Sequence, residues 1–286
     1  MELAFKHWGP ASGPISERLI FLHGMGGTGS LWRPLAASLE DRYGILAPDQ
    51  RGHGGSLVPT VSGGRNLPHY GPLDYGRDVI DTMEKTGFHP AWLIGHSMGV
   101  RSACAAAHLK PDWVRGLILI DLGFSGAAGG GLGDNLATFM RILPTEFASR
   151  AEARTFMEAH CPDPAIAQYL MAVSTPIEGG RIHFPFDHAA LIETIRAAKN
   201  SSVREWIEEL LKHDMPILIL RGARSLVWSH EEFEAERDRF DRFPTIEFKE
   251  IEGAGHGLPF EQRPLFLKTL EEFIRRYPVD LGGGAT

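Results

Sequence analysis

The sequence predicts an α/β fold: a mostly parallel sheet with helices on both faces and an inserted helical region. Short apolar runs of strand length alternate along the chain with helix-permissive segments, an alternation typical of parallel sheets. The run 114–120 is almost purely apolar, as in a strand buried on both faces. From residue 135 to about residue 212 the sequence has helical segments and no convincing strand, which predicts the insertion.

Seven runs are interpreted as strands because each is short and ends at turn residues such as Gly, Pro or Asp. They are 2–8, 18–22, 44–47, 91–94, 114–120, 216–220 and 245–251. Outside the insertion, helices are predicted from apolar spacing, from Ala content or from a glycine that ends the segment. They are 31–40, 74–87, 100–109, 231–240 and 264–277.

The change from strands to helices after Asp121, and back near residue 213, gives the domain boundaries. We predict a core in two parts, residues 1–123 and 213–280, separated by a helical insertion over residues 124–212. Residues 281–286 are Gly-rich, and we expect them to form a disordered tail.

Composition and charge exclude several classes of partner. The 286 residues carry a formal net charge of -7, which disfavours binding to nucleic acid and to anionic membrane surfaces. The N-terminus lacks a basic region followed by a long apolar one, and no apolar run reaches membrane-spanning length. Cys104 and Cys161 have no metal-like spacing and indicate a reducing compartment. We therefore expect a cytoplasmic protein that uses no metal, nucleic acid or membrane.

Ser97 stands at the centre of Gly95-His96-Ser97-Met98-Gly99, between a predicted strand and an Ala-rich predicted helix. A strand, a sharp turn and a helix with Ser at the apex form the nucleophile-elbow pattern. Glycine is needed at both flanking positions because a Cβ there would collide with neighbouring backbone. The pattern predicts a hydroxyl held at a helix N-terminus, where partial positive charge favours a developing anion.

His256 follows the last predicted strand on a Gly-rich loop. Loops that follow parallel strands emerge at one edge of the sheet, so we expect His256 to lie near Ser97. A Ser hydroxyl needs a base to remove its proton, and an imidazole suits that role near neutral pH. The two residues predict nucleophilic catalysis by Ser97 with His256 as general base.

Four motifs appear in the order seen in the α/β-hydrolase superfamily, so the chain resembles the serine esterases of that superfamily that carry a helical cap. The motifs are His23-Gly24, Asp49-Gln50-Arg51-Gly52-His53-Gly54, the elbow around Ser97, and Gly253-Ala254-Gly255-His256. The resemblance implies an α/β-hydrolase fold with a mostly parallel eight-stranded sheet, in which the insertion is the cap or lid. It also implies an oxyanion hole made by the backbone N–H groups of Met25 and Met98.

The acid that would orient the histidine departs from the pattern of the superfamily. Most relatives carry Asp in a Gly-x-x-Asp sequence after the penultimate strand, whereas Gly222 is followed by Ser225 at that place. Some members place the acid one strand earlier, where this chain has Asp121, and we interpret Asp121 as the third catalytic residue. Two alternatives stay open, in which Asp121 only caps a turn: a Ser97–His256 dyad with Ser225 bound to the imidazole, or an impaired enzyme.

Residues 24–29 also match Gly-x-Gly-x-x-Gly, the dinucleotide-binding pattern, and Asp49 lies at the end of the next predicted strand. That interpretation leaves the elbow at Ser97 and the loop of His256 unexplained. We therefore expect no nucleotide cofactor and interpret Asp49 and Arg51 as residues that build a turn.

Ester hydrolysis is the function that these residues predict. We expect a serine hydrolase that cleaves a carboxylic ester or a related acyl substrate through an acyl-enzyme on Ser97, without a cofactor. Hydrolysis of C–C bonds, lactones or thioesters, and perhydrolysis, use the same machinery and stay open. A weakly catalytic ligand-binding or signalling protein on the same scaffold is the alternative from another class. The mostly apolar insertion predicts a small to medium, largely apolar substrate, and we expect a monomer or homodimer.

Overall fold

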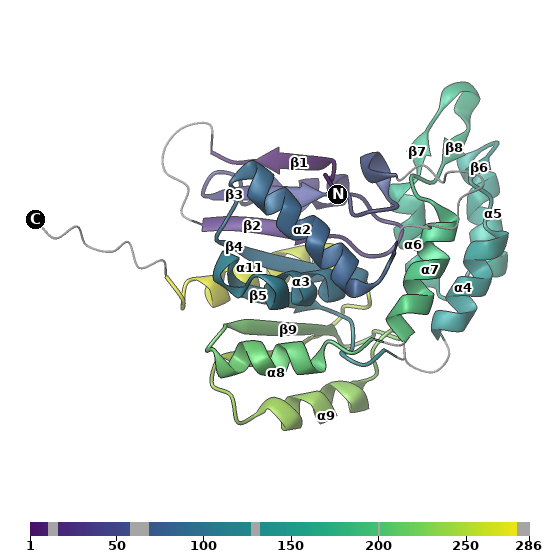
Figure 1. Ribbon diagram of the computed structural model, residues 1–286. Helices are drawn as coiled ribbons and strands as arrows, with labels where there is room; N and C mark the ends of the chain where they lie inside the picture. The colour runs from purple at the N-terminus through teal and green to yellow at the C-terminus, as the bar shows by residue number, and fades with distance from the viewer. Residues whose placement is uncertain (11–16, 58–68, 127–131, 200, 279–286) are drawn as a thin grey trace, which may run out of the picture.

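Seven strands form one sheet in the computed structural model, which describes residues 1–10, 17–57, 69–126, 132–199 and 201–278 (Figure 1). Their order across the sheet is β1-β3-β2-β4-β5-β9-β10. β1 runs antiparallel to β3, and every other neighbouring pair is parallel. The strands are β1 (Phe5–Trp8), β2 (Glu17–Leu22), β3 (Tyr43–Pro48), β4 (Ala91–His96), β5 (Val114–Ile120), β9 (Ile217–Gly222) and β10 (Ile246–Ile251).

The number of strands corrects the expectation of eight. The seven apolar runs of the sequence are the seven strands, and the eighth strand, implied only by the resemblance, is not among the residues that the structure describes. β1 pairs with β3 alone, and its side chains are largely exposed, so β1 is an edge of this sheet.

Helices cover both faces of the sheet and bury two apolar clusters. Figure 1 shows α2 and α3 in front of the sheet and α11 behind it. Along β4, Leu93 faces the cluster under α2 and α3, whereas Trp92 and Ile94 face the cluster under α11. The helices of the first face are α2 (Pro72–Thr86), α3 (Met98–Leu109), α8 (Arg204–Lys212) and α9 (His230–Phe240). Those of the second face are α1 (Arg33–Ala36), α10 (Leu258–Glu261) and α11 (Arg263–Ile274).

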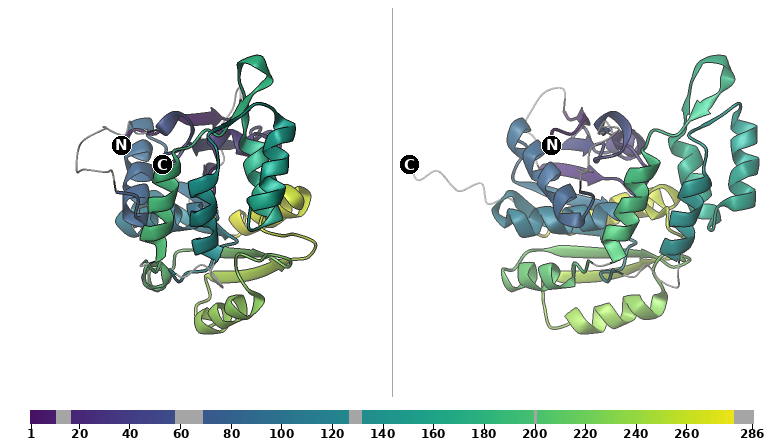
Figure 2. Two further views of the ribbon diagram at one scale, coloured as in Figure 1. Left: turned by 90° about the vertical axis from the view of Figure 1, so that its right-hand side faces the viewer. Right: turned by 45° about the vertical axis from the view of Figure 1, so that its right-hand side comes forward.

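The insertion lies at one end of the sheet, between β5 and β9 in the chain (Figures 1 and 2). Its helices are α4 (Leu132–Ile142), α5 (Arg150–His160), α6 (Pro164–Val173) and α7 (His188–Lys199). It also holds a three-stranded sheet of order β6-β8-β7, formed by β6 (Glu146–Phe147), β7 (Thr175–Pro176) and β8 (Ile182–His183). The expectation of a strand-free insertion was therefore wrong. Strands of two residues are too short to show the alternation by which a strand is recognised.

α8 packs on the core, although its residues were predicted to belong to the insertion. Its residues fall within the range 124–212 predicted for the insertion, but Ile207 and Leu210 pack in the cluster under α3. α8 therefore covers the sheet. The predicted tail 281–286 lies outside the described residues, and the domain boundaries stay predictions. In the described parts of the chain, no helix is both long and apolar enough to cross a membrane.

Candidate active site

The turn between β4 and α3 holds Ser97 in a strained backbone conformation. β4 ends at His96, α3 begins at Met98, and Ser97 between them has φ 53° and ψ -122°. A Cβ on Gly95 would lie 2.4 Å from the carbonyl oxygen of Gly99, so residue 95 must be glycine. The strand–turn–helix context predicted for the elbow is present, and the hydroxyl stands at the N-terminus of α3.

One imidazole connects Ser97 to a buried carboxylate. The Oγ atom of Ser97 lies 3.0 Å from Nε2 of His256, and Nδ1 of His256 lies 2.7 Å from Oδ2 of Asp121. Asp121 is fully buried and His256 is only 9% exposed. A proton on Nδ1 is donated to the carboxylate, which leaves Nε2 free to accept from the hydroxyl. The structure thus brings together the three residues that the sequence proposed as catalytic.

The ends of three parallel strands supply these residues. Ser97 directly follows β4, Asp121 directly follows β5, and His256 lies in the loop between β10 and α10. Because the strands are parallel, their carboxyl ends lie at the same edge of the sheet. Residues up to 159 positions apart in the sequence therefore make direct contact.

Ser225, which occupies the usual position of the acid, contacts the carboxylate rather than the imidazole. Its hydroxyl donates to Oδ2 of Asp121 at 2.5 Å, and the N–H of Gly222 donates to Oδ1 at 2.9 Å. With the bond from His256, the carboxylate accepts three hydrogen bonds. β5 and β9 are neighbours in the sheet, which is why a side chain after either strand reaches this point. The position of Asp121 is therefore fixed by both strands.

His96, which the sequence analysis did not single out, supports the backbone of His256. Its Nε2–H donates to the carbonyl oxygen of His256 at 2.7 Å, and the two rings lie with their centroids 4.9 Å apart and their planes tilted by 38°. Burial, with a smaller contribution from the neighbouring His256, lowers the pKa of His96 to about 3. His96 is therefore neutral. Its place beside Ser97 in the elbow is the signal that could have pointed to it.

The loop that carries Met25 is held by buried polar groups. The N–H of Gly26 donates to Nε2 of His53 at 2.9 Å, and Nδ1–H of His53 donates to the carbonyl oxygen of Arg51 at 2.9 Å. Burial lowers the pKa of His53 to about 4, so the ring stays neutral and Nε2 can accept. The side chains of Met25 and Met98 belong to one apolar cluster. The two segments proposed to form the oxyanion hole therefore meet.

Asp49 also stabilises this loop. Its carboxylate accepts from the N–H of Gly29 at 2.7 Å and from the N–H of Gly55 at 2.8 Å. The residue that a dinucleotide fold would use for the ribose thus holds two backbone segments together. Within the described ranges of the chain, no group of three or more His, Cys, Asp or Glu residues could hold a metal ion.

A small, mostly apolar pocket opens above Ser97. It has a volume of about 40 Å³, and its floor is formed by residues of the core: Gly24, Met25, His96, Ser97 and His256. The walls come from α4 and α6 of the insertion: Leu136, Met140, Ile166, Tyr169 and Leu170. The hydroxyl of Tyr169 lies 3.3 Å from the carbonyl oxygen of Gly24, beside the Met25 loop. The sequence predicted an apolar wall but did not identify its members.

This architecture defines the class of the protein: a mostly parallel sheet with the elbow strand at its centre and an insertion after β5 is the α/β-hydrolase fold. A solved structure of a marine microorganism esterase matches with a TM-score of 0.74 at 22% identity, covering 95% of this chain and 99% of that chain. The model of the alpha/beta hydrolase family matches residues 19–267, so the chain belongs to the alpha/beta hydrolase family.

Two relatives match over most of their length. The 2-(acetamidomethylene)succinate hydrolase of Mesorhizobium japonicum is 28% identical, over 92% of this chain and 88% of the relative. The esterase YbfF of Escherichia coli is 23% identical, over 90% of this chain and 92% of the relative. The names of the two relatives indicate different substrates. The comparisons therefore agree on hydrolase chemistry but do not define the substrate of this chain.

Proposed function

We propose that the protein is a serine hydrolase that cleaves a small, uncharged carboxylic ester through an acyl-enzyme on Ser97. The observation that carries the proposal is the continuous pair of hydrogen bonds from Ser97 through His256 to Asp121. In this role His256 is the general base, and Asp121 holds its ring in the tautomer that can accept a proton.

The reaction follows from this geometry in two stages. Nε2 of His256 takes the hydroxyl proton as Oγ of Ser97 attacks the ester carbonyl, and the same proton then passes to the leaving alcohol. The N–H groups of Met25 and Met98 stabilise the oxyanion of the tetrahedral intermediate. Water, activated by His256, then attacks the acyl-enzyme and releases the acid, which restores the Ser97 hydroxyl.

The lining of the pocket supports a neutral acyl group. None of the ten lining residues in the described part of the chain is Lys, Arg, Asp or Glu. A carboxylate carried into this pocket would lose its hydration without gaining a cation, which costs several kcal/mol. A succinate, such as the one in the name of the Mesorhizobium relative, would therefore be disfavoured. The volume of about 40 Å³ favours short acyl chains.

Hydrolysis of p-nitrophenyl acetate by wild type and by Ser97→Ala tests the proposal. We expect the variant to lose at least about 10³-fold in kcat/KM, since the nucleophile is gone. Ser30→Ala, at an exposed serine outside the pocket, is the matched control and should keep the wild-type rate. Equal rates for wild type and Ser97→Ala would refute the nucleophile.

A fluorophosphonate probe distinguishes this enzyme from a ligand-binding protein on the same scaffold. Rapid covalent labelling of Ser97 requires an activated hydroxyl. A wild-type protein that binds small esters reversibly but neither turns them over nor reacts with the probe would favour the binding protein. The same panel, extended to lactones and thioesters, ranks the related acyl substrates.

A further inference from the structure

Arg101 is a buried cation that the proposed chemistry does not use. It lies on α3, four residues after Ser97, and is only 7% exposed. One terminal nitrogen of its guanidinium, Nη2, donates to the carbonyl oxygen of Ser125 at 2.6 Å. The other, Nη1, donates to the carbonyl oxygen of Ser201 at 3.2 Å. Arg101 thus binds two backbone segments that are 76 residues apart.

Backbone carbonyl groups, rather than an acid, offset this charge. Among the described residues no carboxylate forms an ion pair with Arg101, and burial lowers the pKa of its guanidinium. The guanidinium stays protonated at neutral pH because its ordinary pKa is so high. Ser201 follows the C-terminal end of α7, and its N–H donates to the carbonyl oxygen of Ala198. A cation at a helix C-terminus is stabilised by the unpaired carbonyl groups there.

The two segments that Arg101 joins are the entrance and the exit of the insertion. Ser125 precedes α4, and Ser201 follows α7. The segments also contact each other: the N–H of Val203 donates to the carbonyl oxygen of Phe124 at 3.0 Å. A Cβ on Gly126 would lie 2.3 Å from the carbonyl oxygen of Lys199, so the two backbones approach closely. Arg101 therefore sits at the junction where the chain leaves the core for the insertion and returns from it.

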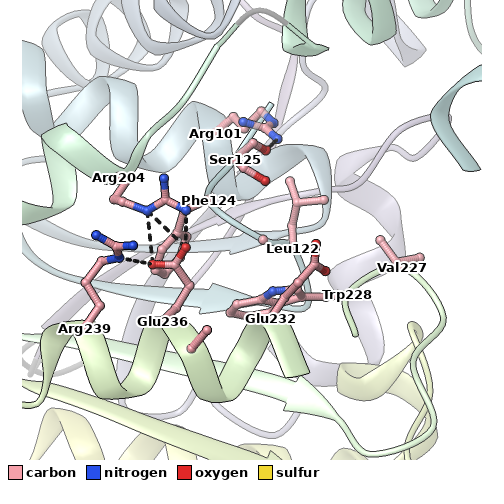
Figure 3. Close-up of a pocket in the computed structure, with 12 residues that line it drawn as sticks. Arg101, Leu122, Phe124, Ser125, Arg204, Val227, Trp228, Glu232, Glu236 and Arg239 are labelled. Carbon is pink, nitrogen blue, oxygen red and sulfur yellow. Dashed lines mark hydrogen bonds and ion pairs between the residues drawn. The ribbon is translucent and has the colours of Figure 1, made fainter. Parts of the chain in front are cut away.

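Figure 3 shows this junction on the edge of a second pocket, of about 200 Å³, next to the core. Arg101 lies beside Ser125 on one side of the pocket. On another side, Arg204 is paired with Glu236, which also forms an ion pair with Arg239 (Figure 3). Arg204 is thus a neighbouring arginine whose charge is satisfied by an acid. It offers a matched comparison for Arg101.

The junction is linked to the wall of the active-site pocket through the packed helices α4 and α7. α4 begins after the entrance and α7 ends at the exit, and these two helices pack against each other. α4 supplies Leu136 and Met140 to the pocket above Ser97. The same α3 that carries Arg101 begins directly after Ser97. The contacts of Arg101 therefore join the helix that begins beside the nucleophile to the ends of the two helices α4 and α7.

We propose that Arg101 is a positioning residue that sets the distance between the insertion and Ser97 and thereby limits the length of the acyl chain. The proposal rests on the proposed function, since it concerns the selectivity of the same pocket. When both hydrogen bonds are present, α4 is held over the nucleophile and the pocket stays short. When they are lost, the entrance and the exit of the insertion are no longer bound to α3, and α4 can move away from the nucleophile so that longer acyl chains gain entry. Other hydrogen bonds, such as those between Tyr75 and Thr194 and between Asp187 and Gly52, still keep the insertion on the core.

The test compares Arg101→Met, Arg101→Lys and Arg204→Met with wild type. Methionine keeps much of the side-chain length but donates no hydrogen bond, whereas lysine keeps the charge and can still bind a carbonyl. Three readouts are needed: kcat and KM for p-nitrophenyl acetate and octanoate, the rate at which a fluorophosphonate labels Ser97, and amide hydrogen exchange in α4 and α7. Thermal unfolding shows whether each variant is folded.

In Arg101→Met we expect the ratio of kcat/KM for octanoate to that for acetate to rise about tenfold, mainly through a lower KM for octanoate. Exchange in α4 and α7 should become faster, while labelling of Ser97 stays within about threefold of wild type, because the nucleophile is intact. For Arg101→Lys we expect a ratio of the two esters between those of wild type and Arg101→Met. Arg204→Met should keep the wild-type ratio, because Arg204 binds Glu236 instead of the junction.

Three results would overturn the proposal. The first is an unchanged ratio of the two esters in Arg101→Met. The second is a parallel loss of labelling and of both activities, because that would make Arg101 a support for Ser97 itself. The third is unchanged hydrogen exchange in α4 and α7. If Arg101→Met does not fold, the same readouts in Arg101→Lys decide. A wild-type protein that is not labelled would refute the proposed function, and hydrogen exchange would still decide on the junction.

Discussion

Replacing Asp121 with Asn should remove most hydrolysis while leaving the shape of the site intact. In the native chain, Oδ2 of Asp121 accepts from His256 and Ser225, and Oδ1 accepts from the N–H of Gly222. Asparagine has one acceptor oxygen, which the N–H of Gly222 retains. Its NH₂ group then faces Nδ1 of His256, so Nδ1 must accept and the ring proton moves to Nε2.

An imidazole that carries its proton on Nε2 cannot take a proton from Ser97. In a Ser-His-Asp site this change of tautomer typically lowers kcat about 10⁴-fold, equivalent to about 5 kcal/mol in activation free energy. The assay is the initial rate of p-nitrophenyl acetate hydrolysis at pH 7.5, together with the rate of fluorophosphonate labelling. A variant that keeps more than about a tenth of the wild-type rate would refute the role of Asp121.

Ser225 provides both a control and a rescue. Ser225→Ala removes one hydrogen bond to Asp121 but leaves the hydrogen bond between Asp121 and His256, so we expect less than about a tenfold loss of rate. Ser225→Asp in the Asp121→Asn background places a carboxylate where most relatives have one. We expect this double variant to regain about 10²-fold over Asp121→Asn. No regain would mean that Ser225 cannot direct an acid toward the imidazole.

Two further predictions concern stability. The pKa values of His53, about 4, and His96, about 3, lie below the value of about 6.5 expected in the unfolded chain, so the unfolded chain binds protons that the folded chain does not. The contribution of these two residues to the free energy of unfolding is therefore complete above pH 6.5 and is lost as the pH drops toward 4, by about 3 kcal/mol from His53 alone. Urea unfolding at pH 7.5 and at pH 5 measures this loss. Equal unfolding midpoints at the two pH values would contradict the prediction. Gly99→Ala places a Cβ 2.3 Å from the carbonyl oxygen of Leu22 and should destabilise the fold by about 2 kcal/mol or more. A thermal unfolding midpoint equal to that of wild type would contradict the close approach of Gly99 to β2.

The long-range arrangement of the site follows from sequence patterns because parallel strands end at one edge. Once the runs 91–94, 114–120 and 245–251 were assigned to such a sheet, Ser97, Asp121 and His256 had to lie along that edge. The helices predicted over 74–87 and 231–240 correspond to α2 and α9 within two residues, because a glycine or a capping serine marks their ends.

Other features could not be derived because they depend on contacts between distant segments. The helix predicted over 31–40 is only Arg33–Ala36, preceded by a turn of 3₁₀-helix over Gly29–Trp32. Apolar spacing there reflects packing of Trp32 and Leu35 under the sheet rather than a regular helix. The place of His96 beside Ser97 draws attention to the residue, but its partner is a carbonyl oxygen 160 residues away, and no local pattern identifies that partner.

The choice between Asp121 and Ser225 shows the same limit. The sequence identified both positions but left open which side chain would reach the imidazole. That outcome depends on β5 and β9 being neighbours, so that the hydroxyl after β9 donates to the carboxylate after β5. Strand order in a sheet is a property of the whole chain, and periodicity within one strand does not contain it.

The contact between Phe124 and Val203 has a consequence for how such enzymes diversify. Because the insertion leaves and re-enters the core at the same point, its removal or exchange leaves two chain ends already in register for joining. A recombination event at this point exchanges the whole insertion, including the pocket wall above Ser97, as one unit, while the strands that carry the reacting groups stay unchanged. New substrate preferences can therefore arise in one step instead of through many coordinated substitutions.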